Sequence, residues 1–251
     1  MEINSTLTLR RINVLKTLTI ETSSKMCGVS ILEDKTLLQK IELNNGLTHS
    51  ESLMPIINDI FVKTNLHLKD IDLLVCDIGP GSFTGIRIGV ATTKAFSDSL
   101  NIKSIGISSL EALAYNINED NLICSLIDAK NNSCYYALYK LEENKYKEII
   151  EPAADNLDNI ISILNKYKNN IIFVGDGAVN YKDIIIKSIE TAIIADDNEI
   201  HSYNLGLAGI NKYFSPTFSN ELLPLYLRKP QAERQLEEKL NAHKKDSDKN
   251  V

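Results

Sequence analysis

The chain has 251 residues, of which 43% are hydrophobic and 24% are charged, and its formal net charge at pH 7 is −6. These values are typical of a globular protein, and a chain of this length can form one sizeable domain or two small ones. The acidic balance argues against direct binding of nucleic acid by this chain, because phosphate groups are held by basic surface. No apolar run approaches the ~18 residues that a membrane-spanning helix requires.

The spacing of cysteine and histidine indicates neither a disulfide framework nor a metal site. The cysteines contain no C-x-x-C pair, and the histidines contain no pair at the spacing of metal ligands. We therefore expect a reduced, cytoplasmic compartment, no metal and no cofactor. The residues are Cys27, Cys76, Cys124, Cys134, His49, His67, His201 and His243.

Residues 1–15 precede the first convincing strand and are predicted to form an N-terminal extension. They lack the apolar segment of a secretory signal, so we expect an extra strand or a loosely ordered segment. Their serines and threonines and the pair Arg10-Arg11 leave an organellar leader as the alternative, although Glu2 counts against it.

Strands and helices alternate after this extension. The first strand ends at Glu21, and the next two form a hairpin. Thr48 and Glu51 form a capping-box pattern, which predicts a helix over residues 48–64. The three strands are predicted over residues 16–20, 27–32 and 36–43.

A glycine-rich loop then joins a buried strand, predicted over residues 71–78, to a helix over residues 86–100. The glycines indicate positive φ values and a close approach of the backbone to a neighbour. That neighbour is either an anion or nucleotide at the unpaired N–H groups of the helix, or another part of the chain. The candidate residues are Gly79, Gly81, Ser82, Thr84 and Gly85.

The loop matches neither common phosphate-binding motif. Gly79 and Gly85 stand six positions apart, one more than in a Walker A loop, and Ile86-Arg87 replaces the Lys-Ser/Thr pair of that motif. Thr84 occupies the third-glycine position of the dinucleotide fingerprint. We therefore favour close packing over anion binding as the role of the glycines.

The second half of the chain repeats the order of the first: strand, acidic residue, hairpin, helix, strand, glycine turn and helix. This repetition predicts two α/β halves that arose by duplication and enclose a cleft. We expect the first half over residues 16–103, the second over residues 104–230, and a polar helix or tail over residues 231–251.

Glu21 and Asp128 end the first strand of each half and are expected to face the cleft. Carboxylates in this position hold a metal–phosphate group in nucleotide-binding proteins, or they cap the turn that follows the strand. Neither residue is followed by glycine, and capping is the commoner role.

Further motifs are Glu21-Thr22-Ser23, His49-Ser50-Glu51, Gly79 to Gly89, Gly106 to Ala112 and Tyr226-Leu227-Arg228. Together these motifs resemble the TsaB (YeaZ) family over about residues 16–230. The resemblance implies an actin/Hsp70-like (ASKHA, ribonuclease H-like) α/β fold of two duplicated halves with a cleft between them. Glu21, where the family commonly has aspartate, and the extension over residues 1–15 depart from the family pattern.

The resemblance also implies a role in tRNA modification. The family assists a sister subunit, TsaD, in placing a threonylcarbamoyl group on the adenosine beside the anticodon of tRNAs that read codons beginning with A. A small ATPase, TsaE, joins this complex, and tRNA is reached through the complex. The chain is then a scaffold or activator subunit and not an enzyme.

TsaD carries an H-x-x-x-H metal pair, and the aligned positions in this chain are Ser109 and Leu113. A serine hydroxyl is a poor ligand for a transition metal and leucine is none, so we do not expect metal-dependent transfer by this chain alone.

The family implies that the helices over residues 48–64 and 86–100 pair with equivalent helices of TsaD, or of a second copy of the chain, as a four-helix bundle. We expect one face of each helix to be core and part of the other to be interface. The residues assigned to these interface helices are His49, Ser50, Leu53, Met54, Ile57, Arg87, Gly89 and Val90.

Two other functions remain as alternatives. An ATP-dependent small-molecule kinase of the same superfamily would need complete phosphate loops, whereas Glu21 precedes Thr-Ser-Ser and Asp128 precedes Ala-Lys. A homodimeric binding module without a tRNA role would use the same two helices.

Overall fold

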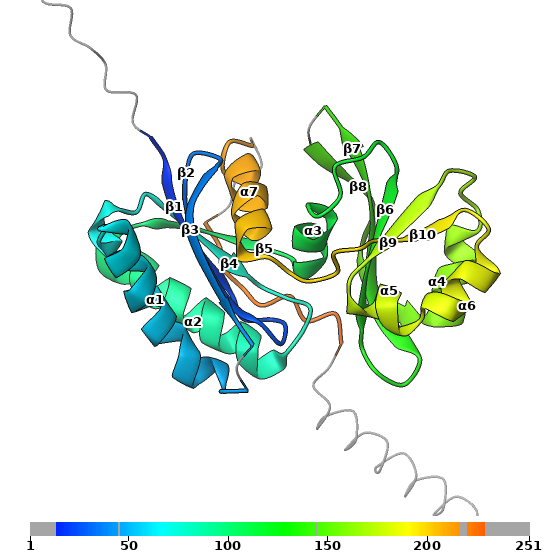
Figure 1. Cartoon of the computed structure of the whole chain (residues 1–251), viewed down its shortest axis with the longest axis horizontal. Coiled ribbons are helices and arrows are strands. Elements are labelled where there is room, and N and C mark those ends of the chain that lie inside the picture. Colours follow the sequence, from blue (N-terminus) through cyan, green and yellow to red (C-terminus); the bar gives the residue numbers. More distant parts are fainter. Residues whose placement is uncertain (1–13, 45, 144, 216–219, 229–251) are drawn as a thin grey trace, which may run out of the picture.

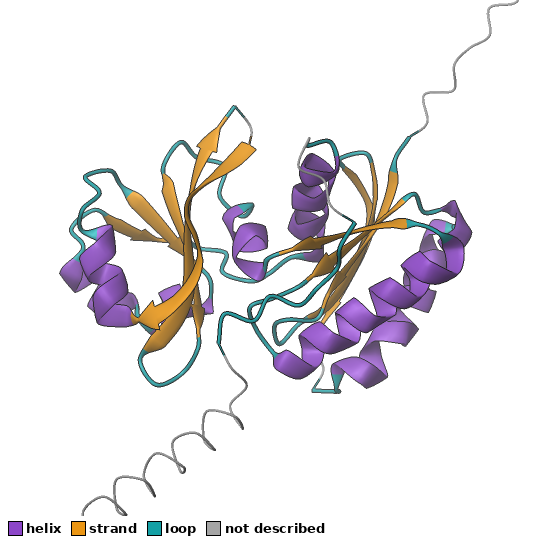
Figure 2. Ribbon diagram, turned by 180° about the vertical axis from the view of Figure 1, so that it is seen from behind, coloured by secondary structure: helices purple, strands orange, loops and turns teal. Residues whose placement is uncertain are grey.

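The computed structural model describes residues 14–44, 46–143, 145–215 and 220–228 (Figures 1 and 2). The predicted tail over residues 231–251, and residues 1–13 of the predicted extension, lie outside these ranges. The chain forms two α/β halves that stand side by side, each built on its own mixed sheet (Figure 1).

The first sheet has the strand order β3-β2-β1-β4-β5. The first three strands form an antiparallel meander, whereas β4 runs parallel to β1 and β5 runs parallel to β4. Every residue of β4 is buried, as expected for a continuous apolar run in the middle of a sheet. The strands are β1 (Lys16–Glu21), β2 (Cys27–Glu33), β3 (Thr36–Leu43), β4 (Leu73–Asp77) and β5 (Lys103–Ile107).

The second sheet has the order β10-β9-β6-β7-β8, which is the order of the first sheet counted from the other edge. Here too an antiparallel meander is followed by two parallel strands. The predicted duplication and the actin/Hsp70-like fold are therefore confirmed. The strands are β6 (Leu122–Asp128), β7 (Ser133–Glu142), β8 (Lys145–Asn156), β9 (Ile171–Val174) and β10 (Ala192–Ile194).

Helices cover both faces of each sheet. In the first half, α1 and α2 lie side by side on one face and α7 covers the other (Figures 1 and 2). In the second half, α3 packs on the face that is turned toward α7, and the remaining helices lie at the opposite face and the lower edge (Figure 1). The helices are α1 (His49–Thr64), α2 (Phe83–Leu100), α3 (Ser109–Ala114), α4 (Leu157–Leu164), α5 (Asp176–Asn180), α6 (Lys182–Ser188) and α7 (Ser202–Tyr213), with a 3₁₀ turn, η1, at Leu68–Asp70.

Local capping explains where the two long helices begin and end. The N–H of Thr48 donates to the Glu51 carboxylate over 2.9 Å, which confirms the predicted capping box of α1. Both helices end at an asparagine in the left-handed conformation, Asn65 with φ +53° and Asn101 with φ +54°.

The division between the halves differs from the expected boundary after residue 103. β5 pairs with β4, so the first sheet continues to Ile107. Later in the chain, α7 packs on the first sheet, and the N–H of Leu225 donates to the carbonyl of Ile78 over 2.8 Å. The end of the described chain therefore returns to the first half, and the second half is an excursion from it.

Candidate functional site

The glycine-rich loop packs against the turn between β1 and β2. The N–H of Ser82 donates to the carbonyl of Ser23 over 2.7 Å, and a Cβ at Gly81 would overlap that carbonyl. A Cβ at Gly85 would overlap the carbonyl of Thr22. The space that a bound anion needs next to these glycines is taken by the chain's own backbone, which supports the close-packing interpretation.

The remaining loop residues shape the start of α2. Gly79 adopts a φ of +96°, which glycine takes without steric cost. The hydroxyl of Ser82 accepts the N–H of Gly85 over 3.2 Å and so caps the helix. Ser82 and Thr84 are exposed.

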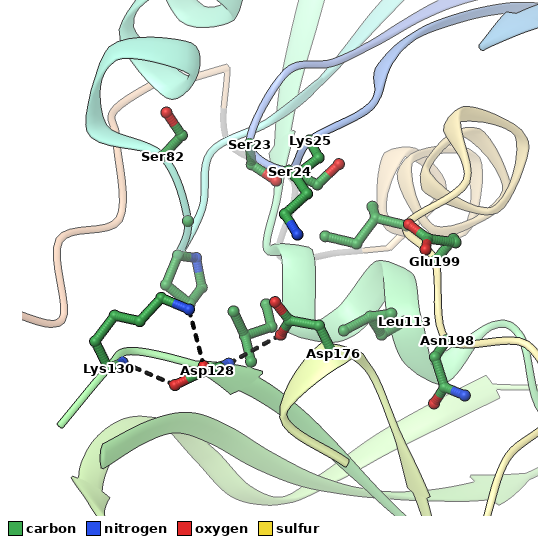
Figure 3. A pocket seen from close by; sticks show the side chains of 14 residues that line it. Ser23, Ser24, Lys25, Ser82, Leu113, Asp128, Lys130, Asp176, Asn198 and Glu199 are labelled. Carbon is green, nitrogen blue, oxygen red and sulfur yellow. Dashed lines mark hydrogen bonds and ion pairs between the residues drawn. The ribbon is translucent and has the colours of Figure 1, made fainter. Parts of the chain in front are cut away.

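A cavity of about 450 Å³ lies between the two halves (Figure 3). The first half contributes the β1–β2 turn (residues 23–25) and the glycine loop (residues 80–82). The second half contributes the end of β6, the start of α5 and the segment over residues 198–200, and Leu113 of α3 forms part of the wall. The structure therefore contains the expected cleft.

Side chains of both charge signs line this cavity. Lys25 comes from the first half, and Asp128, Lys130, Asp176 and Glu199 come from the second (Figure 3). Among these lining residues the carboxylates outnumber the ammonium groups. Such a lining disfavours a polyphosphate that carries no bound cation, because a free polyphosphate binds best where positive potential dominates.

Asp128 caps the turn that follows β6. One of its oxygens accepts the backbone N–H of Lys130 over 2.8 Å, and the other lies 3.0 Å from the Lys130 ammonium and 3.1 Å from the amide nitrogen of Asn180. Burial raises the pKa of this carboxyl, but the hydrogen bonds from Lys130 outweigh that effect and lower it overall. Asp128 lines the cavity, as expected, with its oxygens engaged by its own half.

Glu21 does not line the cavity, in contrast to the expectation that it faces the cleft. Its side chain is completely buried. Its Oε1 accepts the N–H groups of Ser23 and Ser24 over 2.8 and 2.9 Å, so the carboxyl caps the β1–β2 turn from beneath. Ser23 and Ser24 line the cavity in its place.

A second buried carboxyl, Asp77 at the end of β4, lies next to Glu21. Burial is the main cause that raises both pKa values, for Glu21 to about 8, with Asp77 adding to the effect, and for Asp77 to about 6. Because the charge of one carboxyl acts on the other, the two titrate as a pair.

The positions aligned with the transferase metal pair lie at and beside this cluster. Ser109 is completely buried, and its hydroxyl donates to Asp77 over 2.7 Å. Leu113 is 1% exposed and belongs to the hydrophobic core. Within the described residues, no group of three His, Cys, Asp or Glu side chains is placed to hold a metal ion.

The residues predicted for the partner interface divide into buried and exposed sets. Leu53, Ile57 and Val90 are core residues, and Gly89 is buried, so these four pack within the first half and not outward. The exposed ones are Ser50, Met54 and Arg87.

His49 links α1 to the cavity wall and to the glycine loop. It is half-buried, its Nε2 lies 2.9 Å from the carbonyl oxygen of Ser24, and its ring lies close to Gly85.

Arg87 binds the last described segment of the chain. Its Nε donates to the Tyr226 hydroxyl over 2.9 Å, and its guanidinium lies 5.7 Å from the centre of the same ring. The ring of Tyr226 is also stacked on Phe83, with 5.1 Å between the ring centres. The Tyr-Leu-Arg motif thus anchors the returning segment to the first turns of α2.

Several polar residues of the site were not singled out from the sequence, among them Asp77, Asp176 and Asn198. Asp77 is a carboxylate at the end of an otherwise apolar strand, and that contrast was the available signal. Asp176 follows Gly175, whose φ of +113° makes it the counterpart of the glycine after β4. The Asn198 amide is held by Gly175 N–H at 2.9 Å, a contact that no local pattern indicates.

Comparison with known proteins agrees with this architecture. Residues 43–236 match the family model described as TsaD, tRNA N6-adenosine threonylcarbamoyltransferase. The chain is 28% identical over 218 residues to the tRNA threonylcarbamoyladenosine biosynthesis protein TsaB of Bacillus subtilis (strain 168), covering 86% of this chain and 95% of that protein. It is 28% identical over 228 residues to TsaB of Haemophilus influenzae, covering 85% of this chain and 94% of that protein.

Solved structures show the same fold. YeaZ from Pseudomonas aeruginosa superposes with a TM-score of 0.71 at 21% identity, covering 85% of this chain and all (100%) of that chain. No helix in the described ranges has the length and apolar character to cross a membrane. The chain belongs to the TsaB (YeaZ) family, within the wider family whose model is described as the tRNA N6-adenosine threonylcarbamoyltransferase TsaD.

Proposed function

We propose that the chain is a scaffold and activator subunit in the synthesis of threonylcarbamoyladenosine on tRNA. It acts with a TsaD-like subunit, which carries the transfer chemistry, and with a TsaE-like ATPase. The names of its relatives, tRNA threonylcarbamoyladenosine biosynthesis proteins, support the pathway. The net charge of −6 supports contact with tRNA through the complex and not through this chain alone.

The observation that carries the non-catalytic role is the state of Ser109 and Leu113. The Ser109 hydroxyl is engaged by Asp77 and Ser23 at 2.7 and 3.0 Å, and Leu113 is packed in the core. A metal that needs nitrogen or carboxylate ligands gains none from these two positions.

The outer faces of α1 and α2 are the proposed docking surface for the TsaD-like subunit. On α1, Met54 and Val62 stand eight positions apart on one side and are 52% and 73% exposed. On α2, the exposed Ala91 and Ala95 are small enough to let a partner helix approach closely. The two helices lie side by side (Figure 1), so their faces combine into one surface.

Depletion of the chain in the cells that make it tests this role. Threonylcarbamoyladenosine in total tRNA, measured by mass spectrometry, is expected to fall on depletion and to recover with the wild-type chain. The Met54→Glu variant is expected to restore less modification than Val179→Glu, which alters an equally exposed residue of the second half (both 52%). Unchanged modification after complete depletion would overturn the proposal.

A further inference from the structure

Two buried carboxyls in the first half lie next to each other, and the proposed function does not explain why they do. Glu21 and Asp77 end the adjacent parallel strands β1 and β4, and neither is exposed to solvent. Among the described residues, neither carboxyl takes part in an ion pair with lysine or arginine. Two unpaired anions in one buried site are unfavourable, so the site needs compensation of another kind.

The hydrogen-bond geometry shows what that compensation is. Ser23 Oγ lies 3.0 Å from Glu21 Oε1, 2.9 Å from Asp77 Oδ2 and 3.0 Å from Ser109 Oγ, and Ser109 Oγ lies 2.7 Å from Asp77 Oδ1. These are four oxygen–oxygen contacts, but the two serine hydroxyls supply only two protons. If both carboxyls were ionised, two of the contacts would bring lone pairs together.

We propose that Glu21 and Asp77 hold one shared proton at neutral pH, bound to Oδ2 of Asp77 and donated to the hydroxyl of Ser23, which donates to Oε1 of Glu21. The backbone donors favour this arrangement. Glu21 Oε1 already accepts two N–H groups, from Ser23 and Ser24, and is therefore suited to carry the charge.

On Asp77, the backbone donor identifies which oxygen carries the proton. Oδ1 accepts the N–H of Gly79 over 2.7 Å, which leaves Oδ2 as the site of protonation. The raised pKa values of both carboxyls agree with a bound proton. The pKa of Glu21 is raised further than that of Asp77, and it is the backbone donors that assign the proton to Asp77.

The shared proton joins three elements beneath the cavity. Ser23 belongs to the β1–β2 turn, Asp77 holds the glycine loop through Gly79, and Ser109 begins α3 and donates its own N–H to the Gly79 carbonyl over 2.9 Å. Loss of the proton leaves two repelling anions at this junction. We therefore expect the turn and the loop to loosen when the pair is deprotonated.

Other titratable groups surround the pair. The Cys27 and Cys76 thiols lie on β2 and β4, and burial raises the pKa of each to about 12, so both are neutral. His49 of α1 contacts the turn at the Ser24 carbonyl, and Glu42 of β3 lies on the other side of Gly28. A comparison between the wild type and a variant of the pair cancels the contributions that these groups make to both proteins.

Asp77→Asn is the first test, because its amide can accept from Gly79 and donate to Ser23 as the protonated acid does. The folded pair holds its proton above the pKa values of an unfolded chain, so its stabilisation is complete at low pH and declines as the pH rises to about 8. The unfolding equilibrium constants of both proteins are compared between about pH 5 and pH 8. For each pH unit in this range, the ratio of the wild-type constant to the Asp77→Asn constant should rise about tenfold. Asp128→Asn, a strand-end carboxyl whose pKa is lowered, should keep the wild-type slope.

Infrared spectroscopy gives an independent readout. The difference spectrum of wild type minus Asp77→Asn at pH 7 should contain the carbonyl band of one protonated carboxylic acid, shifted in heavy water. If the asparagine variant does not fold, Glu21→Gln takes its place in both measurements. Parallel pH slopes, or a difference spectrum without the acid band, would show that Asp77 carries no proton at neutral pH and would overturn the proposal.

Discussion

Replacement of Met54 by glutamate is expected to weaken association with the TsaD-like subunit and to leave the isolated chain folded. Met54 is 52% exposed on the outer side of α1, so a charge there is solvated in the free chain. Complete burial of a methionine side chain is worth about 1.5–3 kcal/mol, and about half of this side chain is still accessible to a partner. Loss of that half corresponds to about 0.8–1.5 kcal/mol, or roughly a four- to twelvefold rise in Kd. An unpaired carboxylate in the interface adds to this effect.

Titration calorimetry with the purified TsaD-like subunit measures the change. Val179→Glu is the matched control, because Val179 is also 52% exposed but lies on α5 in the second half. We expect Met54→Glu to raise Kd at least about tenfold and Val179→Glu to leave it unchanged. Equal values of Kd for the wild type and a folded Met54→Glu variant would refute the assignment of this surface.

Two further predictions concern the stability of the isolated chain. Gly85→Ala places a methyl group against the backbone carbonyl of Thr22, so we expect it to lower the free energy of unfolding by about 1–3 kcal/mol. Gly46→Ala, at a φ of +76° with open space around it, should show only backbone strain and therefore a smaller loss in urea denaturation. Equal losses would contradict the close packing of the glycine loop. The ring nitrogens of His201 lie 3.2 Å from a carboxylate oxygen of Glu42 and 2.8 Å from one of Asp197. The hydrogen bond to Glu42 is the main cause that raises the pKa of His201, and the one to Asp197 adds to it. Its contribution to stability is complete below its unfolded pKa of about 6.5 and is lost as the pH rises through the folded value. His201→Asn should therefore destabilise the chain at pH 6 and have little effect at pH 9, and equal destabilisation at both would rule out this ion pair.

Much of the fold was predictable because strands and helices leave periodic patterns in the sequence. The apolar run in the sequence predicted β4 to within a few residues, and the capping-box pattern did the same for the start of α1. The partner of a strand is not a local property. The chain before β5 gives no sign that this strand pairs with β4 and not with the second sheet, and the return of α7 to the first sheet depends on tertiary packing in the same way.

The candidate site was predicted in part. The sequence places acidic residues at two strand ends, and Asp128 does line the cavity. Whether such a carboxylate faces the cleft or the core depends on the turn that follows it. The amides of Ser23 and Ser24 draw Glu21 inward, where it meets Asp77 on the neighbouring strand. That meeting follows from strand order, which becomes known only with the fold.

An omission series with purified components is the most direct test of the activator role. Unmodified tRNA, ATP, the threonylcarbamoyl donor, the TsaD-like subunit, the TsaE-like ATPase and this chain are combined, and each protein is left out in turn while the modified adenosine is followed by mass spectrometry. We predict that modification requires this chain together with the TsaD-like subunit, and that the chain alone forms no product. Full modification without the chain, or product formed by the chain in the absence of the TsaD-like subunit, would contradict it.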